Sequence, residues 1–373
     1  MRSKILVVLF ALTLGTLSIG NLFAPKRAFS EHENRYLAQM PALNGKSILD
    51  GSFSAGFEEY ITDQFLFRDS WVQLKTAAEQ ALQKLDSGGV YLAKDGYLIE
   101  MFDSYDEAEY EKQLAYLHTF ERNVAQRLGV PVSIMLVPTA SYALADKLPA
   151  NTPEADQSAM LTKAASMLSS FIDVSSALLQ HNGEYIYYRT DHHWTSLGAF
   201  YAYSQYCTHT GLSTPSLEEY QAETLSTQFL GTTYSKVGLY STSPDTITGY
   251  LPQNAPIISV EYNLGQTTSN SIFERSYLQT KDKYSAFFNA NQSVTRAIST
   301  GNAGGKLLII KDSYANTFAQ FPLKDYQEVH MLDLRYYKLS VYDYIEQNGI
   351  TDVLVLYNLK GLQTDKTLHA LAQ

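Results

Sequence analysis

Apolar residues occur along this chain in two patterns, as short continuous runs and as longer stretches with helical spacing. Mostly apolar runs at 132–137, 306–310, 328–332 and 352–357 predict buried strands, and residues 185–188 predict another. Helical spacing predicts helices at 105–128, 153–180, 197–206 and 341–347, with a further helix from about residue 314. Buried strands that alternate with helices indicate βαβ units around a parallel sheet, and therefore an α/β fold.

Three regions fall outside this alternation. Residues 57–85 have helical spacing, and Arg68-Asp69 in their middle indicates a break between two helices. Residues 90–92 and 97–99 flank Lys94-Asp95-Gly96 and predict a β-hairpin. The stretch from about 212 to 300 is rich in Thr, Ser, Gly and Tyr and contains short alternating runs, which predict a β-rich insertion.

The N-terminal residues predict a membrane segment. Arg2 and Lys4 precede a mostly apolar run from Ile5 to Ala24, which is long enough to span a bilayer. Pro25 comes directly after Ala24, and no clean small-x-small cleavage site follows the run, so a retained signal anchor is favoured over a cleaved signal peptide. We therefore assign residues 1–28 to this segment and expect the remainder, 29–373, to lie outside the cytoplasm.

Charge and cysteine content narrow the classes of function. The formal net charge is -10, and no Lys/Arg cluster interrupts it, so nonspecific nucleic-acid binding is not expected. Cys207 is the single cysteine, which excludes an intrachain disulfide and Cys-based metal sites. The histidines show no H-x-x-x-H pair, so no metal and no cofactor are expected.

Several polar residues come just after predicted strands, where ligands bind in open α/β sheets. Asp191, His193 and Ser313 are the residue types of an acyl-transfer site, with Ser313 as nucleophile, His193 as base and Asp191 orienting the base. Asp191 and His193 are two residues apart and share a face in an extended segment, from which His192 points away. The alternatives are an Asx turn at Asp191 and a helix cap at Asp312-Ser313.

The candidates for contact with substrate or oxyanion are four other residues, namely Asn358, Trp194, Tyr314 and Tyr234. Thr139 and Asn358 also follow predicted strands, and the Asn358 amide is a candidate oxyanion donor. Trp194, Tyr314 and Tyr234 are candidate substrate-binding aromatics, and Tyr234 lies in the small-residue loop 231–236. The alternatives are a strand-end turn for Asn358, a core aromatic for Trp194 and a plain β-turn for the loop.

These motifs together resemble those of the DHHW protein family. The resemblance rests on residues 190–195 (Thr-Asp-His-His-Trp-Thr), on the front segment 30–38, on 231–236 and on 311–316. That family is similar to the alginate O-acetyltransferase proteins, whose catalytic domain is SGNH-hydrolase-like, with the Asp–x–His pair before the serine. Two features depart from the pattern: His192 stands where the alginate enzymes have a different residue, and no Gly directly precedes Asp312-Ser313.

The resemblance implies a three-layer SGNH-like fold over residues 29–373 and an extracytoplasmic O-acetyltransferase. It implies that Ser313 accepts an acetyl group, supplied across the membrane by a membrane-bound O-acyltransferase partner, and that a polysaccharide is the acceptor. A carbohydrate esterase of the same architecture is the alternative enzyme, since water and a sugar hydroxyl compete for the same acyl-enzyme. A non-catalytic polysaccharide-binding or assembly protein is the third possibility.

Overall fold

The structure is a computed structural model that describes residues 2–30, 33, 35–82, 84–238, 242–300 and 304–373. The chain divides into two compact units, each of which is described by itself. The larger, which we call the main unit, contains residues 89–233 and 242–373, and the N-terminal unit contains residues 1–88 and 234–241. The prediction that residues 29–373 form one catalytic domain stays a prediction.

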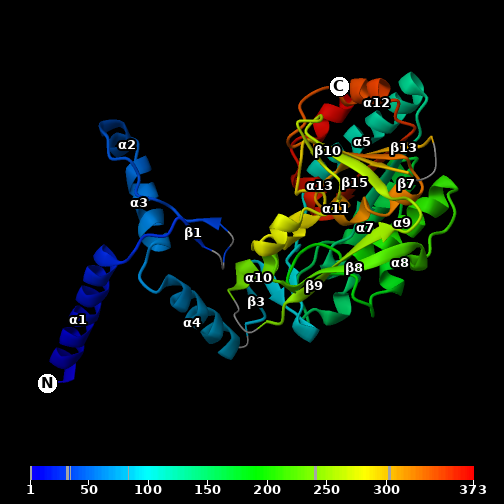
Figure 1. The fold of residues 1–373 in the computed structure, drawn as a ribbon. Coiled ribbons are helices and arrows are strands. Elements are labelled where there is room, and N and C mark those ends of the chain that lie inside the picture. The colour runs from blue at the N-terminus through cyan, green and yellow to red at the C-terminus, as the bar shows by residue number, and fades with distance from the viewer. Residues whose placement is uncertain (1, 31–32, 34, 83, 239–241, 301–303) are drawn as a thin grey trace. The chain divides into compact units, whose positions relative to one another are not determined.

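An eight-stranded sheet in the order β11-β10-β12-β14-β13-β15-β6-β7 forms the centre of the main unit (Figure 1). Strands β14, β13, β15, β6 and β7 run parallel to one another, whereas β12, β10 and β11 add antiparallel pairs. The bounds are β6 Val132–Val137, β7 Phe171–Ile172, β10 Ile257–Tyr262, β11 Thr267–Ser269, β12 Val294–Ser299, β13 Lys306–Lys311, β14 Glu328–Leu332 and β15 Asp352–Asn358. The four predicted buried strands are therefore confirmed.

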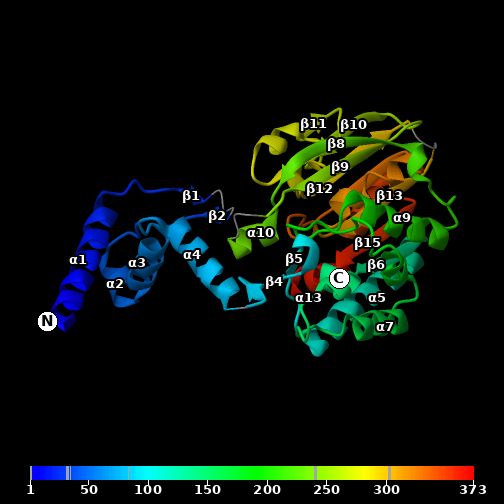
Figure 2. The ribbon, with the colours of Figure 1, turned by 90° about the horizontal axis from the view of Figure 1, so that it is seen from below.

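Alternate residues of each central strand enter two different hydrophobic cores, because successive side chains of a strand point to opposite faces. Leu307 and Ile309 of β13 belong to one core, and Leu308 and Ile310 belong to the other. Residues of α5, α7, α12 and α13 pack in the core on one face, and residues of α6, α8, α9 and the β8–β9 ribbon pack in the core on the other. In Figure 2, α5 and α7 lie on one side of the sheet and the ribbon lies on the other. The predicted three-layer α/β architecture is present.

The helices of the main unit follow the predicted pattern in most places. Their bounds are α5 Glu107–Leu128, α6 Ala140–Ala143, α7 Gln157–Met167, α8 Ser175–Gln180, α9 Ser196–Thr210, α11 Ala315–Phe318, α12 Val341–Asn348 and α13 Leu359–Thr364. The segment predicted as one helix over 153–180 is instead α7, β7 and α8. The buried Glu121 carboxylate explains the break, since it accepts hydrogen bonds from the backbone N–H groups of Ser169 and Ser170.

Two further predictions about local structure are wrong. Residues 185–188 do not form a strand of the sheet, because Tyr187 pairs with Trp194 in a single antiparallel bridge and the chain between them bends. The helix expected from residue 314 is only the single turn of α11. It ends before Pro322, which begins a 3₁₀ turn and cannot continue an α-helix.

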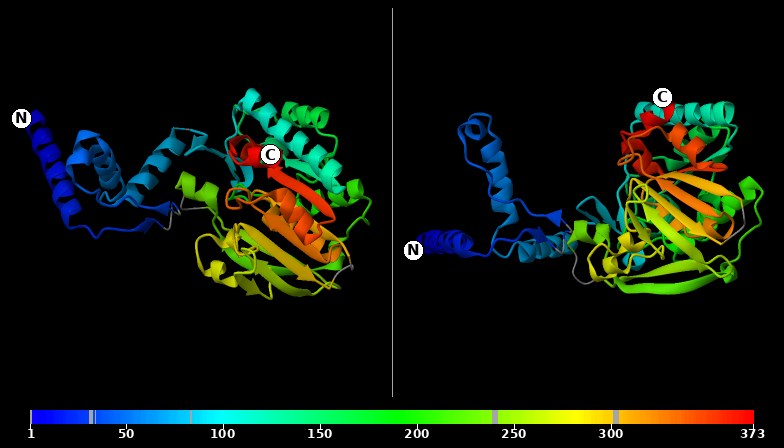
Figure 3. Two further views of the ribbon diagram at one scale, coloured as in Figure 1. Left: turned by 90° about the horizontal axis from the view of Figure 1, so that it is seen from above. Right: turned by 45° about the horizontal axis from the view of Figure 1, so that its top comes forward.

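The segment predicted to be β-rich supplies two kinds of strand. Strands β8 (Tyr220–Phe229) and β9 (Asp245–Pro252) pair with each other in an antiparallel ribbon, whereas β10, β11 and β12 extend the central sheet. The predicted hairpin is confirmed as β4 (Val90–Leu92) and β5 (Leu98–Glu100). The C-terminal 3₁₀ turn (Leu368–Ala372) lies beside α5 in both views of Figure 3. Just before this turn, the backbone oxygen of Asp365 accepts a hydrogen bond from Gln113 of α5.

The N-terminal unit begins with α1 (Arg2–Phe23). Its segment Lys4–Phe23 is long and apolar enough to cross a membrane, with a mean hydropathy of 2.1. After it come β1 (Phe29–Ser30), β2 (Arg35–Tyr36), α2 (Gly45–Leu49), α3 (Ser52–Asp63), α4 (Arg68–Ala81), β3 (Asp86–Ser87) and the later part of α10 (Thr232–Val237). The predicted break near Arg68 is confirmed, because α3 ends at Asp63 and α4 begins at Arg68.

The front segment of the family resemblance is tied to α3 by a buried carboxylate. Asp63 accepts hydrogen bonds from both terminal nitrogens of Arg35, at 2.8 and 2.5 Å, and from the backbone N–H of Ala38. Glu33 adds ion pairs to Arg35 and Arg68. Positions 31 and 34 of the same segment lie outside the described residues.

Candidate active site

The predicted site residues gather at the carboxyl edge of the parallel strands. Ser313 lies two residues beyond the end of β13, Asn358 is the last residue of β15, and Thr139 follows β6. These strands are neighbours in the order β13-β15-β6 and run in the same direction, so their ends meet at one edge of the sheet. The bend at 189–193 adds Asp191 and His193 to this edge.

Asp191, His193 and Ser313 form a continuous chain of hydrogen bonds. His193 Nδ1 lies 2.5 Å from Asp191 Oδ1, and His193 Nε2 lies 2.7 Å from Ser313 Oγ. The backbone N–H of His193 also donates to Asp191 Oδ1, at 3.0 Å. An ionised Asp191 accepts the Nδ1 proton, which leaves Nε2 free to accept the proton of the serine hydroxyl.

The charges around this chain keep its base neutral. Burial and the neighbouring His192 ring lower the pKa of His193 to about 4, although Asp191 acts in the opposite direction. Burial opposes ionisation of Asp191, but the two histidines and its hydrogen bonds hold the pKa of Asp191 well below its usual range. At neutral pH the chain therefore holds a carboxylate and an uncharged imidazole.

The second oxygen of Asp191 is fixed by the segment 231–232. Thr232 donates to Asp191 Oδ2 through its backbone N–H at 2.8 Å and through its hydroxyl at 2.9 Å. Gly231 allows this approach, since a Cβ at Gly231 would lie 2.4 Å from the Asp191 side chain. The segment 231–236, predicted as a loop or a plain β-turn, is instead mostly the helix α10 (Thr232–Val237), and the first residue of α10 supports the carboxylate.

A buried aspartate holds the chain just before Asp191. Asp245, at the start of β9, accepts hydrogen bonds from the backbone N–H groups of Arg189 and Thr190, at 3.0 and 2.7 Å. It also accepts from the hydroxyls of Thr190 and Tyr185. Asp245 is 1% exposed, so these contacts replace its hydration.

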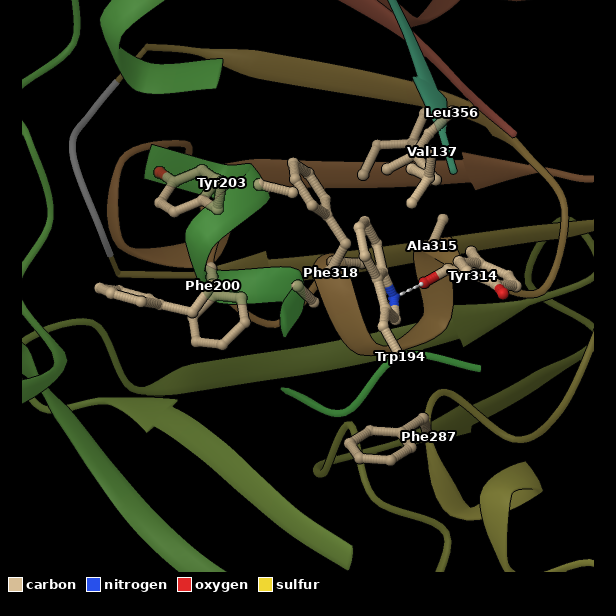
Figure 4. Packing of buried hydrophobic residues seen from close by; sticks show 14 of the residues in the cluster. Val137, Trp194, Phe200, Tyr203, Phe287, Tyr314, Ala315, Phe318 and Leu356 are labelled. Carbon is tan, nitrogen blue, oxygen red and sulfur yellow. Dashed lines mark hydrogen bonds between the residues drawn. The ribbon is translucent and has the colours of Figure 1, made fainter. Parts of the chain in front are cut away.

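Aromatic side chains surround the imidazole. The Tyr284 ring stacks on His193 with centroids 3.9 Å apart, and its hydroxyl donates to the backbone oxygen of Ser313. Trp194 is fully buried and donates from Nε1 to the backbone oxygen of Tyr314, at 2.9 Å (Figure 4). Tyr314 in turn donates to the backbone oxygen of His192. Trp194 and Tyr314 thus connect the segment that contains His193 to the segment that contains Ser313, and their predicted roles in substrate binding stay predictions.

His192 does not point away from the site as predicted. Its ring lies beside that of His193, with centroids 3.9 Å apart, and it borders the same cavity as Ser313. The prediction assumed an extended backbone, whereas residues 191–193 bend, so side-chain alternation does not apply.

A polar cavity of about 410 Å³ opens at Ser313. Besides His192, it is bordered by Asp312, Asn358 and charged residues that include Glu100, Arg335 and Lys360. Asn358 donates from Nδ2 to Asp312 Oδ2 at 2.6 Å and accepts from the backbone N–H of Gly361. Its predicted role as an oxyanion donor stays a prediction. Burial raises the pKa of Asp312 to about 6, although hydrogen bonds from the backbone N–H groups of Tyr314 and Asn358 act in the opposite direction.

Metal binding is possible only at the expense of this chain. Asp191, His192 and His193 offer ligand atoms within 4.8 Å of one another. Both ring nitrogens of His193 already bond to Asp191 and Ser313, so a metal ion would have to break one of those bonds. Tyr234 belongs to the N-terminal unit, and its predicted substrate contact stays a prediction.

The comparison with known families agrees with the motifs. The family described as DHHW protein matches residues 88–332, more than half of the chain. The chain belongs to the DHHW protein family. No curated protein matches it by sequence.

Solved structures share the fold of this DHHW protein. A DHHW family protein from Eubacterium siraeum DSM 15702 is 29% identical, with a TM-score of 0.67, over 76% of this chain and 95% of that one. Bacillus cereus PatB1, solved with a sulfonyl adduct, is 20% identical, with a TM-score of 0.63, over 76% of this chain and 100% of that one. The PatB1 likeness shows the fold alone.

Three supporting residues were not anticipated from the sequence. Tyr284 and Asp245 lie in the β-rich segment, far along the chain from the motifs they contact, and no local pattern identifies them. Thr232 lies in the small-residue loop 231–236, which was the one available signal, although its contact is with Asp191.

Proposed function

We propose that this DHHW protein is an O-acyltransferase that forms an acyl ester on Ser313 and passes the acyl group to a saccharide hydroxyl. One observation carries the proposal: the hydrogen-bonded chain from Asp191 through His193 to Ser313 ends at a polar cavity. A nucleophile, a base and a group that orients the base are what acyl transfer through a covalent intermediate requires.

In the first half-reaction, Ser313 Oγ attacks the carbonyl carbon of an acyl donor ester while His193 Nε2 takes the hydroxyl proton. The developing oxyanion needs N–H donors. One candidate is the Ser313 backbone N–H, which bonds to none of the described residues. The other is the second hydrogen on Asn358 Nδ2. The tetrahedral intermediate then expels the donor alcohol, which takes the proton from His193. In the second half-reaction, His193 deprotonates the acceptor hydroxyl, which attacks the acyl-enzyme and releases Ser313.

The family resemblance supports acetyl as the acyl group and a polysaccharide as the acceptor. The apolar segment Lys4–Phe23 supports a location at the outer face of the cell membrane, with α1 as a signal anchor. Such a location fits a membrane-bound O-acyltransferase as the partner that supplies acetyl groups. We propose no cofactor, since each step uses only the residues above.

The proposal is tested with p-nitrophenyl acetate as donor, with and without oligosaccharides. We expect a burst of p-nitrophenol, a mass increase of one acetyl group on the protein and acetylated oligosaccharide. Ser313→Ala removes the nucleophile, so all three signals should fall by about 10⁴-fold or more. A sulfonyl fluoride should label the wild type and not the variant, by analogy with the sulfonyl adduct of PatB1.

The same experiment separates the alternatives. Acetate release without acetylated oligosaccharide favours a carbohydrate esterase, in which water is the acceptor. Equal behaviour of the wild type and Ser313→Ala, with oligosaccharide still bound, favours a non-catalytic binding or assembly protein.

A further inference from the structure

His192 takes no part in the chain from Asp191 to Ser313, although it lies between Asp191 and His193 in the sequence. Its side chain is 29% exposed, whereas those of Asp191 and His193 are 2% and 6% exposed. It borders the cavity that opens at Ser313. His192 is therefore positioned to touch a molecule that enters the cavity.

The hydrogen bonds of Thr232 determine how the His192 ring is oriented. The Thr232 hydroxyl has one proton, which it donates to Asp191 Oδ2 at 2.9 Å. His192 Nδ1 lies 2.7 Å from the same hydroxyl oxygen, so Nδ1 must carry the proton of that contact. In the neutral ring, Nε2 then has a lone pair, and it bonds to none of the described residues.

The His192 ring lies close to the reacting atoms. Its centroid is 3.9 Å from that of His193, whose Nε2 is 2.7 Å from Ser313 Oγ. A saccharide that brings one hydroxyl to an acyl group on Ser313 would therefore bring a neighbouring hydroxyl towards His192. Water has no second hydroxyl to offer at that point.

We propose that His192 determines acceptor specificity by accepting a hydrogen bond at Nε2 from a second hydroxyl of the saccharide. The inference rests on the proposed function. The reacting hydroxyl loses its proton to His193 Nε2, its oxygen bonds to the acyl carbon, the bond from that carbon to Ser313 Oγ breaks, and the proton passes to Oγ. His192 exchanges no proton; it holds the saccharide in place, and so favours transfer over hydrolysis.

Two substitutions separate this role from a structural one. His192→Asn keeps an N–H donor near the position of Nδ1 for Thr232 but has no group at the position of Nε2. His192→Gln places an amide oxygen near the position of Nε2 and loses the contact with Thr232. If His192 binds the acceptor, His192→Asn should lower the ratio of transfer to hydrolysis by about tenfold, which is the effect of one hydrogen bond. His192→Gln should keep this ratio within about threefold of the wild-type value.

The readouts are acyl-enzyme formation from p-nitrophenyl acetate and its partition between water and cellopentaose, chitopentaose or xylopentaose. Methanol, which has no second hydroxyl, is the acceptor control, and its partition ratio should be the same in His192→Asn as in the wild type. His181→Asn is the matched control variant, because His181 is also 29% exposed and pairs with Glu184 outside the cavity.

Each contrary result has a distinct meaning. If the wild type forms no acyl-enzyme, the proposed function fails. If acyl-enzyme forms and only hydrolyses, or if His192→Asn partitions like the wild type, the inference about His192 is overturned and the acyl-enzyme stands. If His192→Asn lowers transfer to methanol as much as to saccharide, or if His192→Gln is the more impaired variant, His192 acts through Thr232 and Asp191, and the inference is likewise overturned.

Discussion

His193 is held between groups that act on its charge in opposite directions. The Asp191 carboxylate at 2.5 Å favours the protonated imidazole, whereas burial and the His192 ring disfavour it, and the result is a pKa lowered to about 4. A base that stays neutral well below pH 7 accepts the serine proton over a wide pH range, although its lower basicity weakens each transfer.

This balance predicts the pH dependence of acylation. The base acts only when neutral, so activity is present above the pKa of His193 and is lost as pH falls through it. The acid limb of kcat/KM for p-nitrophenyl acetate should therefore lie below 6.5, the ordinary value for histidine. His192→Asn removes the neighbouring ring that lowers the pKa of His193, so its acid limb should move to higher pH. An acid limb at or above 6.5 in the wild type would contradict the lowered pKa of His193.

At the scale of elements, the bend at 189–193 depends on a contact that crosses from the β8–β9 ribbon. Asp245 accepts from the backbone N–H groups of Arg189 and Thr190, and Thr190 directly precedes Asp191. Asp245→Asn places an amide N–H₂ against these donors, so we expect unfolding free energy to fall by about 2 kcal/mol, measured by urea denaturation. Acylation by the folded variant should also slow, because Asp191 loses its fixed position.

The control for Asp245 is Asp106→Asn. Asp106 caps α5 by accepting from the backbone N–H of Glu109, and asparagine caps helices about equally well. Asp106→Asn should therefore change neither stability nor acylation appreciably. If Asp245→Asn loses stability but the folded fraction acylates at the wild-type rate, Asp245 stabilises the fold without positioning Asp191.

The close approach of Gly231 to Asp191 gives a second prediction at the scale of elements. A Cβ at this position would lie 2.4 Å from both Cβ and Oδ2 of Asp191, so Gly231→Ala must displace the carboxylate or the loop. A displacement of about 1 Å lowers rates by about 100-fold, and the burst rate of p-nitrophenol should fall accordingly. Gly183→Ala is the matched control, because no atom lies within 4 Å of its added Cβ. A wild-type burst rate in Gly231→Ala would show that the loop moves without carrying Asp191 with it.

The sequence predicted the elements that have a local pattern. The runs that became β6, β13, β14 and β15 are continuous and apolar, and the side chains just beyond β13 could therefore be expected at a common edge of the sheet. The bend at 189–193 has no such pattern, because it depends on Asp245, which is more than fifty residues away, and so the direction of His192 was predicted wrongly. The contact of Tyr284 with His193 could not be predicted either, because Tyr284 also lies far from His193 in the sequence.

At the scale of the whole molecule, the candidate site and the apolar helix α1 belong to different units of the chain. Every residue of the Asp191–His193–Ser313 chain belongs to the main unit, and both cores of that unit are formed from residues after position 88. Segment Lys4–Phe23 of α1 is 0% buried, so packing does not account for its apolar surface. The membrane location proposed above would account for it.

Removal of residues 1–28 should therefore separate location from chemistry. The shortened protein should move from the membrane fraction to the soluble fraction, detected by immunoblot, and should keep the wild-type burst rate with p-nitrophenyl acetate when purified. In cells, alkali-labile acetate on surface polysaccharide should fall, because the acetyl supply is proposed to lie in the membrane. Replacing 1–28 with an unrelated single-span anchor distinguishes two causes: recovered acetylation shows that proximity to the membrane is sufficient, and no recovery shows that the α1 sequence itself contacts the partner. A shortened protein that still sediments with membranes would contradict anchoring by α1.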